Sequence, residues 1–197
     1  MIYYLSRALT RFLARIGLRL EVLGRENIPS DGPVIICGNH IANYDPPLIG
    51  GSLRRSAYYL AKEELFHPWP LGPYFRSIHA IPVARGRADR ESLEQALRVL
   101  RRGEALVIFP EGTRSRNGKL GELHKGVVFL ARRSGVPIVP VGVQGPYGWR
   151  RRVVIRFGPA FRLPEPGQGP KADLELIRRA IMDQLPAANW DEQENSD

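Results

Sequence analysis

A histidine and an aspartate stand five positions apart, at His40 and Asp45. They follow the run 34–39, whose apolar residues end in Gly-Asn and are typical of a buried strand leading into a loop. Ligands of α/β folds bind in loops at the carboxyl ends of strands. There Asp45 could accept from one ring nitrogen of His40, fix its tautomer and leave the other nitrogen free to take a proton. The spacing is compatible with a general base, and equally with a loop histidine and a helix cap before two prolines.

Residues 109–115, Phe-Pro-Glu-Gly-Thr-Arg-Ser, form a second candidate loop. It overlaps the run 105–112, which predicts a buried strand that ends in a loop. Proline and glycine favour a tight loop, and Arg114 with backbone N–H groups could bind a phosphate. In isolation, the same residues also fit an ordinary turn with a solvated arginine.

Length and composition restrict the class of protein. The chain has 197 residues, of which 43% are hydrophobic and 25% charged, and these values are typical of one globular domain rather than of long disorder or a multi-pass membrane protein. Its 29 basic and 20 acidic residues give a net charge of +9. This excess indicates an anionic partner: nucleic acid, an acidic lipid surface or a phosphorylated substrate.

The sequence offers little for metal or thiol chemistry. Cys37 is the only cysteine, so an intrachain disulfide and a cysteine-based zinc site are excluded, and its apolar neighbours indicate a buried side chain. The histidines at 67, 79 and 124 lack zinc-like spacing. We therefore expect no metal and no bound cofactor.

Strand-like and helix-like segments alternate along the chain. Strands are predicted at 34–39, 79–86, 105–112, 136–145 and 151–158, and helices from Asp45 and at 89–102, 126–133 and 173–185. The alternation predicts an α/β fold, a single layered domain with a largely parallel sheet flanked by helices. Pro137 and Pro140 predict that their strand lies at an edge of the sheet or contains a bulge.

The first twenty residues predict a basic amphipathic helix. Arginine recurs every fourth residue at 7, 11, 15 and 19, and leucines with Phe12 occupy the other side. Such a helix either packs on the domain with solvated arginines or lies in an anionic membrane interface. The regular stripe and the tyrosines at 3 and 4 favour the interface, with the arginines at lipid phosphates and the leucines buried.

These features suggest three parts: a membrane-interface helix at 1–24, a folded domain at 25–185 and an acidic flexible tail at 186–197. The first twenty residues contain no uninterrupted apolar stretch that is long enough for a secretory signal or a spanning helix. We expect a peripheral protein on the cytoplasmic face of the cell membrane.

Four blocks of sequence occur in an order that is specific for one family. The blocks are Asn39-His40 through Asp45, Ile-Pro-Val-Ala-Arg-Gly at 81–86, Phe-Pro-Glu-Gly-Thr-Arg-Ser at 109–115 and Val-Pro-Ile-Val-Pro-Val at 136–141. With them, the chain resembles the glycerolipid acyltransferase family, and most closely its bacterial 1-acyl-sn-glycerol-3-phosphate acyltransferases. The resemblance covers roughly residues 20 to 160. It implies a glycerol-3-phosphate-acyltransferase-like fold.

The resemblance also implies an activity. A fatty acyl group would move from a thioester, acyl-CoA or acyl carrier protein, to the free hydroxyl of 1-acyl-glycerol 3-phosphate (lysophosphatidic acid), giving phosphatidic acid in phospholipid biosynthesis. His40 would be the general base and Asp45 would orient it, without an acyl-enzyme. Another lysophospholipid or glycerol 3-phosphate remains open as the acceptor.

Further roles follow from the resemblance. The substrate-binding residues that it implies are Asn39, Lys62, Arg85, Glu111, Gly112, Thr113 and Arg114. The two arginines and the lysine would hold the acceptor phosphate, Glu111 and Gly112 would shape the acceptor site, and Asn39 would brace the histidine loop.

Two other classes compete with this interpretation. A thioesterase or lipase-like hydrolase would need a nucleophile, but the chain has no Gly-x-Ser-x-Gly elbow. A nucleic-acid-binding module is suggested by charge alone, but the arginines are spread over the whole chain and no recognition motif is present. We therefore expect no nucleic-acid partner.

Overall fold

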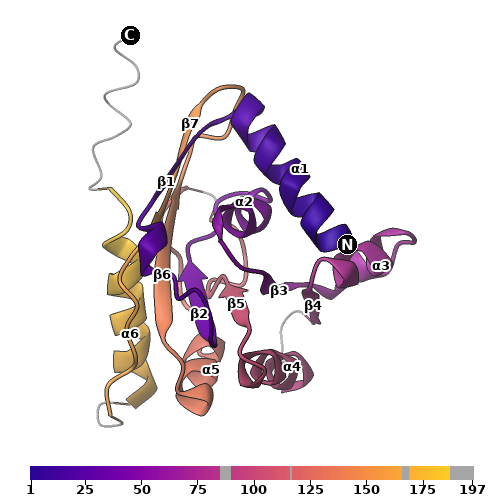
Figure 1. Ribbon diagram of the computed structural model, residues 1–197. Helices are drawn as coiled ribbons and strands as arrows, with labels where there is room; N and C mark the ends of the chain where they lie inside the picture. The colour runs from indigo at the N-terminus through magenta and orange to yellow at the C-terminus, as the bar shows by residue number, and fades with distance from the viewer. Residues whose placement is uncertain (85–89, 116, 166–168, 187–197) are drawn as a thin grey trace.

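A largely parallel sheet forms the centre of the molecule (Figure 1). The computed structural model describes residues 1–84, 90–115, 117–165 and 169–186. Within them, the strands follow the order β1-β7-β6-β2-β5-β3-β4; β6 and β7 are antiparallel and the other neighbours parallel. Their bounds are Arg19–Leu23 (β1), Val34–Gly38 (β2), Ala57–Lys62 (β3), Ala80–Val83 (β4), Ala105–Ile108 (β5), Ile138–Gln144 (β6) and Arg152–Phe157 (β7). The predicted fold class is confirmed.

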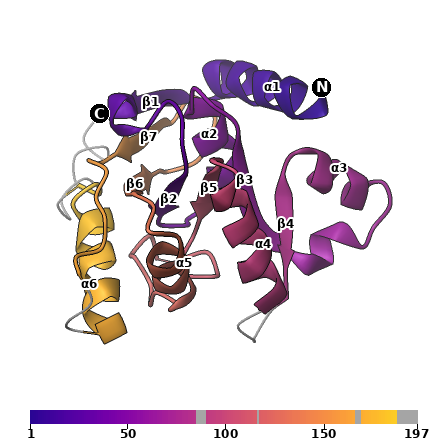
Figure 2. The same cartoon turned by 60° about the horizontal axis from the view of Figure 1, so that its bottom comes forward.

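Helices cover both faces of the sheet. Figure 2 shows α4, α5 and α6 on one side and α1 and α2 on the other, with α3 beyond the β4 edge. The helices are α1 (Ile2–Gly17), α2 (Asp45–Ser52), α3 (Leu71–Ser77), α4 (Arg90–Arg101), α5 (Gly126–Ser134) and α6 (Gly169–Met182), with short 3-10 turns at Arg25–Asn27 (η1) and Glu63–Phe66 (η2).

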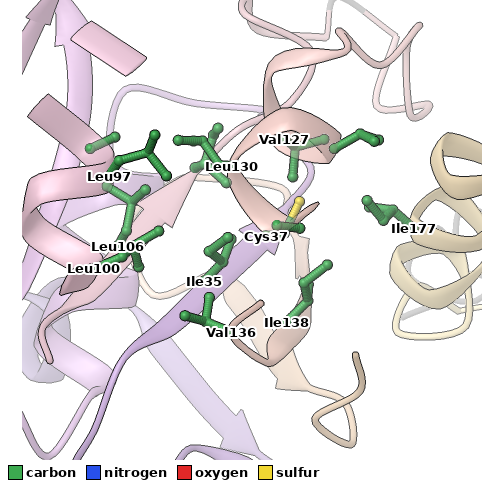
Figure 3. Close-up of a cluster of buried hydrophobic side chains, with 14 of the residues drawn as sticks. Ile35, Cys37, Leu97, Leu100, Leu106, Val127, Leu130, Val136, Ile138 and Ile177 are labelled. Carbon is green, nitrogen blue, oxygen red and sulfur yellow. The ribbon is translucent and has the colours of Figure 1, made fainter. Parts of the chain in front are cut away.

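The central strand β2 is buried on both faces because it lies between two helical layers. Ile35 and Cys37 face the cluster that includes side chains of α4, α5 and α6 (Figure 3). Val34 and Ile36 face the opposite cluster, which includes side chains of α2. This two-sided burial explains why the sequence of β2 is an apolar run rather than an alternating pattern. Because β2 is packed on both faces, the loop at its carboxyl end starts from a rigid strand.

Of the two alternatives predicted for the strand with Pro137 and Pro140, the structure shows the bulge and not the sheet edge. β6 lies between β2 and β7, and Pro137 precedes it. On the side of β6 that faces β7, Ile138 pairs with Phe161 and Val141 pairs with Phe157. The two pairs are three residues apart along β6 and four residues apart along the partner segment, so the partner segment has one extra residue. Pro140 falls in this interval, where its carbonyl accepts from Gly158 N–H at 2.8 Å. The missing N–H therefore coincides with an interruption in the ladder.

Several elements were not predicted. β1, β3 and α3 were missed, and α6 begins at Gly169 rather than at 173. The predicted helix over residues 2–20 ends at Gly17, and Arg19 instead begins β1 and pairs with Arg152 of β7. Thus the segment 1–24 combines a helix with a strand of the sheet. Residues 187–197 of the predicted tail lie outside the described residues.

The structure places two of the stripe arginines of α1 against the domain rather than toward lipid or solvent. Arg11 donates from Nε to Gly51 O at 2.6 Å and from Nη2 to Leu53 O at 2.9 Å, and Arg7 donates to Leu53 O. These carbonyls end α2, where unpaired acceptors and the helix dipole favour cations. The Tyr3 hydroxyl accepts from Ala57 N–H at 2.9 Å. Two of the four predicted stripe arginines therefore attach α1 to the domain, and the apolar side of α1 faces outward.

Candidate active site

The loop after β2 brings together the predicted pair. His40 Nδ1 lies 2.7 Å from Asp45 Oδ2, at the first residue of α2. The same carboxylate oxygen accepts the backbone N–H groups of Ile41 and Ala42, each at 2.7 Å. The Asp45 side chain is 0% exposed and that of His40 is 17% exposed. A buried carboxylate of this kind fixes the ring orientation and stabilises positive charge on the imidazole.

The ring of His40 is held on a second side by an aromatic neighbour. It stacks on Phe109 with a centroid separation of 4.3 Å. With Nδ1–H donating to Asp45, the lone pair of Nε2 remains, and no hydrogen bond to Nε2 occurs within the described residues. This arrangement suits a base that takes a proton through Nε2.

Glu111 holds the backbone of the histidine loop. Its Oε1 accepts His40 N–H at 2.8 Å and its Oε2 accepts Gly121 N–H at 2.8 Å. The carbonyl of His40 accepts Ser115 N–H at 2.7 Å. Glu111 is buried and both its oxygens have backbone donors, so it braces the loops of β2 and β5 against each other. It was predicted to shape the acceptor site, and this clamp shows how it positions His40.

Asn39 makes a two-bond clamp to the neighbouring strand. Its Nδ2 donates to Val143 O at 2.8 Å and its Oδ1 accepts Val143 N–H at 2.7 Å. The side chain is buried, so these bonds satisfy both polar atoms of the amide. The two bonds connect the residue before His40 to β6.

Four of the remaining predicted residues lie on a loop or at a strand end on the same side of the sheet: Lys62, Gly112, Thr113 and Arg114. Gly112 has φ +62°, and a Cβ there would lie 2.9 Å from the His124 ring, so the tight turn requires glycine. Thr113 and Arg114 follow it and are exposed. Lys62 ends β3, which is parallel to its neighbour β5. The predicted Arg85 lies outside the described residues.

A residue missed by the sequence analysis completes the contacts of Asp45. Tyr147, in the β6–β7 connection, donates its hydroxyl to Asp45 Oδ1 at 2.5 Å. Burial and the adjacent Asp45 raise the pKa of Tyr147 above its ordinary value. The two residues are 102 positions apart, and no local pattern connects them.

Thiol chemistry has no support near this edge. Cys37 is buried in β2, and burial raises the pKa of its thiol above the ordinary value, so it stays a neutral thiol. Among the residues that the structure describes, no group of three His, Cys, Asp or Glu side chains could hold a metal ion.

Comparison with known proteins assigns the family. The family model described as "Acyltransferase" matches residues 19–144, which span β1 to β6 and include the loops of His40 and Glu111. The chain belongs to the acyltransferase family. This match includes His40, Asp45 and Glu111, whereas Tyr147 lies just beyond it.

Individual acyltransferases are similar over different lengths. The chain is 34% identical over 128 residues to a 1-acyl-sn-glycerol-3-phosphate acyltransferase of Bacillus subtilis, covering 64% of this chain and 63% of the relative. It is 32% identical over 183 residues to one of Pseudomonas aeruginosa, covering 87% and 69%. It spans less than two thirds of the length of the first of these relatives.

A solved acyltransferase has a similar fold. The crystal structure of the 1-acyl-sn-glycerophosphate (LPA) acyltransferase PlsC from Thermotoga maritima superposes with a TM-score of 0.70 at 26% identity. The match covers 92% of this chain and 77% of that chain. It therefore includes elements outside the family model.

Proposed function

We propose that this acyltransferase moves a fatty acyl group from a thioester to the free hydroxyl of 1-acyl-glycerol 3-phosphate, forming phosphatidic acid. The observation that carries the proposal is the His40–Asp45 contact of 2.7 Å at the edge where the sheet presents its loops. The similar acyltransferases described above are named for 1-acyl-sn-glycerol 3-phosphate, which supports lysophosphatidate as the acceptor.

The reaction needs one base and no covalent enzyme intermediate. Nε2 of His40 takes the proton of the acceptor hydroxyl as its oxygen attacks the thioester carbonyl. The carbonyl carbon gains a C–O bond and loses its C–S bond, and the thiolate leaves as a thiol with the proton from the imidazolium. Asp45 stabilises the charged ring between these transfers, because its carboxylate lies against Nδ1.

Cationic side chains near the same edge fit an acceptor with a phosphate. Arg114 is exposed directly after the Glu111 clamp, and Lys62 ends the strand next to β5. A guanidinium can bind phosphate through two parallel hydrogen bonds, and a lysine adds a point charge. Both side chains would hold the glycerol phosphate while its hydroxyl faces His40; Arg85 is a third proposed contact.

Purified protein in detergent micelles tests the reaction. Acyl-CoA and acyl carrier protein thioesters are each supplied with lysophosphatidate, glycerol 3-phosphate or a choline-headed lysophospholipid, and thiol release and acylated product are measured. We expect equal release of thiol and formation of phosphatidate with lysophosphatidate. Thiol release that does not depend on acceptor would indicate a hydrolase, and preference for another acceptor would overturn the substrate assignment.

We further propose that the acyltransferase works while bound peripherally to a lipid surface, on the cytoplasmic face of the membrane. The outward side of α1 carries exposed apolar residues: Ile2, Leu5, Leu9, Phe12, Leu13 and Ile16. The described helices include none that is long and apolar enough to cross a bilayer. A continuous apolar helix face of this kind favours insertion at the boundary of headgroups and acyl chains.

Aromatic and basic residues flank this face. Trp69, next to α3, is 85% exposed, and Trp149, which lies close to Gly17 at the end of α1, is 74% exposed. Tryptophan is favoured at the headgroup level of membranes. Arg15 on α1 and Arg150 beside Trp149 are exposed and could meet lipid phosphates. A bilayer contact would bring a membrane-resident acceptor to the enzyme.

Co-sedimentation with vesicles tests this surface. We expect binding to phosphatidylglycerol-containing vesicles that weakens in high salt and retains a salt-resistant part from the apolar face. Failure to sediment with either anionic or neutral vesicles would overturn the membrane proposal. It would leave the proposed reaction in micelles unaffected.

A further inference from the structure

The carboxylate of Asp45 has donors on both oxygens, and they come from different parts of the chain. Its Oδ2 accepts from His40 Nδ1 and from the N–H groups of Ile41 and Ala42. Its Oδ1 accepts from the hydroxyl of Tyr147 at 2.5 Å. Within the described residues, Tyr147 is the only donor to Oδ1.

We propose that Tyr147 is a positioning residue for acyl transfer, and that its hydroxyl holds the carboxylate of Asp45 in the orientation that aligns the His40 ring. The proposal rests on the proposed function, because acyl transfer is its readout. Tyr147 acts through Asp45 and is assigned no contact with the reacting atoms.

The bond on Oδ1 adds to the restraint that the three bonds on Oδ2 exert. Rotation about the Cβ–Cγ bond moves both oxygens, so a donor on each oxygen opposes it and keeps Oδ2 directed at the ring. Asp45 is fully buried, so solvent does not supply a donor to Oδ1. The Tyr147 hydroxyl satisfies that oxygen and fixes the rotation.

The protonation state and the neighbouring contacts of Tyr147 suit this role. Burial, followed by the adjacent Asp45, raises the pKa of Tyr147, so its hydroxyl keeps its proton throughout the neutral pH range. Its ring lies near that of Tyr44, with centroids 5.8 Å apart. The same connection is attached to α1, because Arg150 N–H donates to Gly17 O at 2.7 Å.

Tyr147→Phe removes the hydroxyl and keeps the ring. We expect kcat to fall about 10- to 100-fold, as for loss of a hydrogen bond to a charged group, with KM for thioester and acceptor changed less than about threefold. Thermal unfolding and circular dichroism establish that the variant is folded. A kcat within about twofold of the parent would overturn the proposal.

The split between kcat and KM separates positioning from packing. A misaligned His40 ring lowers kcat and leaves both KM values nearly unchanged, whereas loosened packing at the substrate loops changes KM as well. A rise in KM that matches the fall in kcat would assign Tyr147 a packing role and overturn the proposal.

Two comparisons complete the test. Tyr44→Phe removes a hydroxyl from the exposed neighbouring ring and should leave kcat and both KM values unchanged. In an Asp45→Asn background, Tyr147→Phe should cost less than about threefold, because the carboxylate on which it acts is gone. If Tyr147→Phe lowers kcat by the same factor in the Asp45→Asn background as in the parent, then Tyr147 acts independently of Asp45 and the proposal is overturned. A parent enzyme without acyl transfer would instead overturn the proposed function.

Discussion

The two ends of α2 carry contacts of opposite sign and different purpose. At its amino end, the buried carboxylate of Asp45 accepts four hydrogen bonds, including one from the His40 ring. At its carboxyl end, the carbonyls of Gly51 and Leu53 accept from the arginines of α1. Each charge suits the dipole at its end. One eight-residue helix thus joins the candidate active site to the element that we propose docks on lipid.

The two ends of α2 differ in solvent exposure and in what their contacts position. The amino end excludes solvent from a charged group that has every donor it needs, which is the arrangement of a preorganised site. The carboxyl end uses partly exposed guanidinium groups to turn a basic stripe toward protein and an apolar face outward. Removing the contacts at the amino end should abolish acyl transfer in a folded protein. Removing the contacts at the carboxyl end should loosen α1 and leave acyl transfer intact.

The largest effect is expected at the amino end. His40→Ala should leave the fold intact and lower acyl transfer by about 10²–10⁴, because it removes the general base. Asp45→Asn should also be severe, since the amide can favour the wrong ring tautomer. Steady-state rates in micelles, with circular dichroism as the folding control, measure both. A folded His40→Ala variant that keeps more than a third of the activity would exclude the role.

The outward face of α1 should dominate lipid binding. Replacing Leu5, Leu9, Phe12 and Leu13 by serine removes exposed apolar area without touching the contacts to α2. At about 1 kcal/mol for each partly inserted side chain, vesicle partitioning should fall about a thousandfold. Micelle activity is the control and should stay within about threefold. Equal sedimentation of variant and parent would contradict the proposed docking face.

Arg114 tests whether the site next to the amino end also selects the acceptor. A charge-assisted contact to phosphate contributes about 1.5–3 kcal/mol, so Arg114→Ala should raise the apparent KM for lysophosphatidate by one to two decades. The KM for the thioester should change little. Kinetics with each substrate varied separately measure both; a change confined to the thioester would refute the pocket assignment.

The smallest effect is expected at the carboxyl end. Arg7→Gln with Arg11→Gln should reduce the stability of the α1–α2 contact by about 1–2 kcal/mol, because the hydrogen bonds of both arginines are only partly buried and water screens them. Protease sensitivity between α1 and β1 should rise, while kcat in micelles stays near that of the parent. Arg15→Gln is the matched control, since Arg15 is exposed and has no hydrogen bond to α2. A collapse of kcat would show that α1 docking and chemistry are coupled through α2.

Local signals accounted for the framework of the site. The apolar run at 34–37 predicted β2, and the spacing of His40 and Asp45 placed both on the loop that follows it. The pair needed no distant information, since a turn and the start of a helix bring positions five apart into contact. The periodicity of the first residues also predicted α1. It left two orientations of the helix open, because periodicity does not identify what each face of a helix contacts.

The sequence by itself determined that strands and helices alternate, that the chain is basic, and that His40 and Asp45 share one loop, because these are properties of neighbouring residues. Only the tertiary structure decided that Glu111 clamps the His40 backbone, that Tyr147 reaches Asp45, and that two stripe arginines face α2. Those contacts join segments 40 to 102 positions apart. They depend on which strands become neighbours in the sheet. Packing of the whole chain determines that order, and no local sequence pattern does.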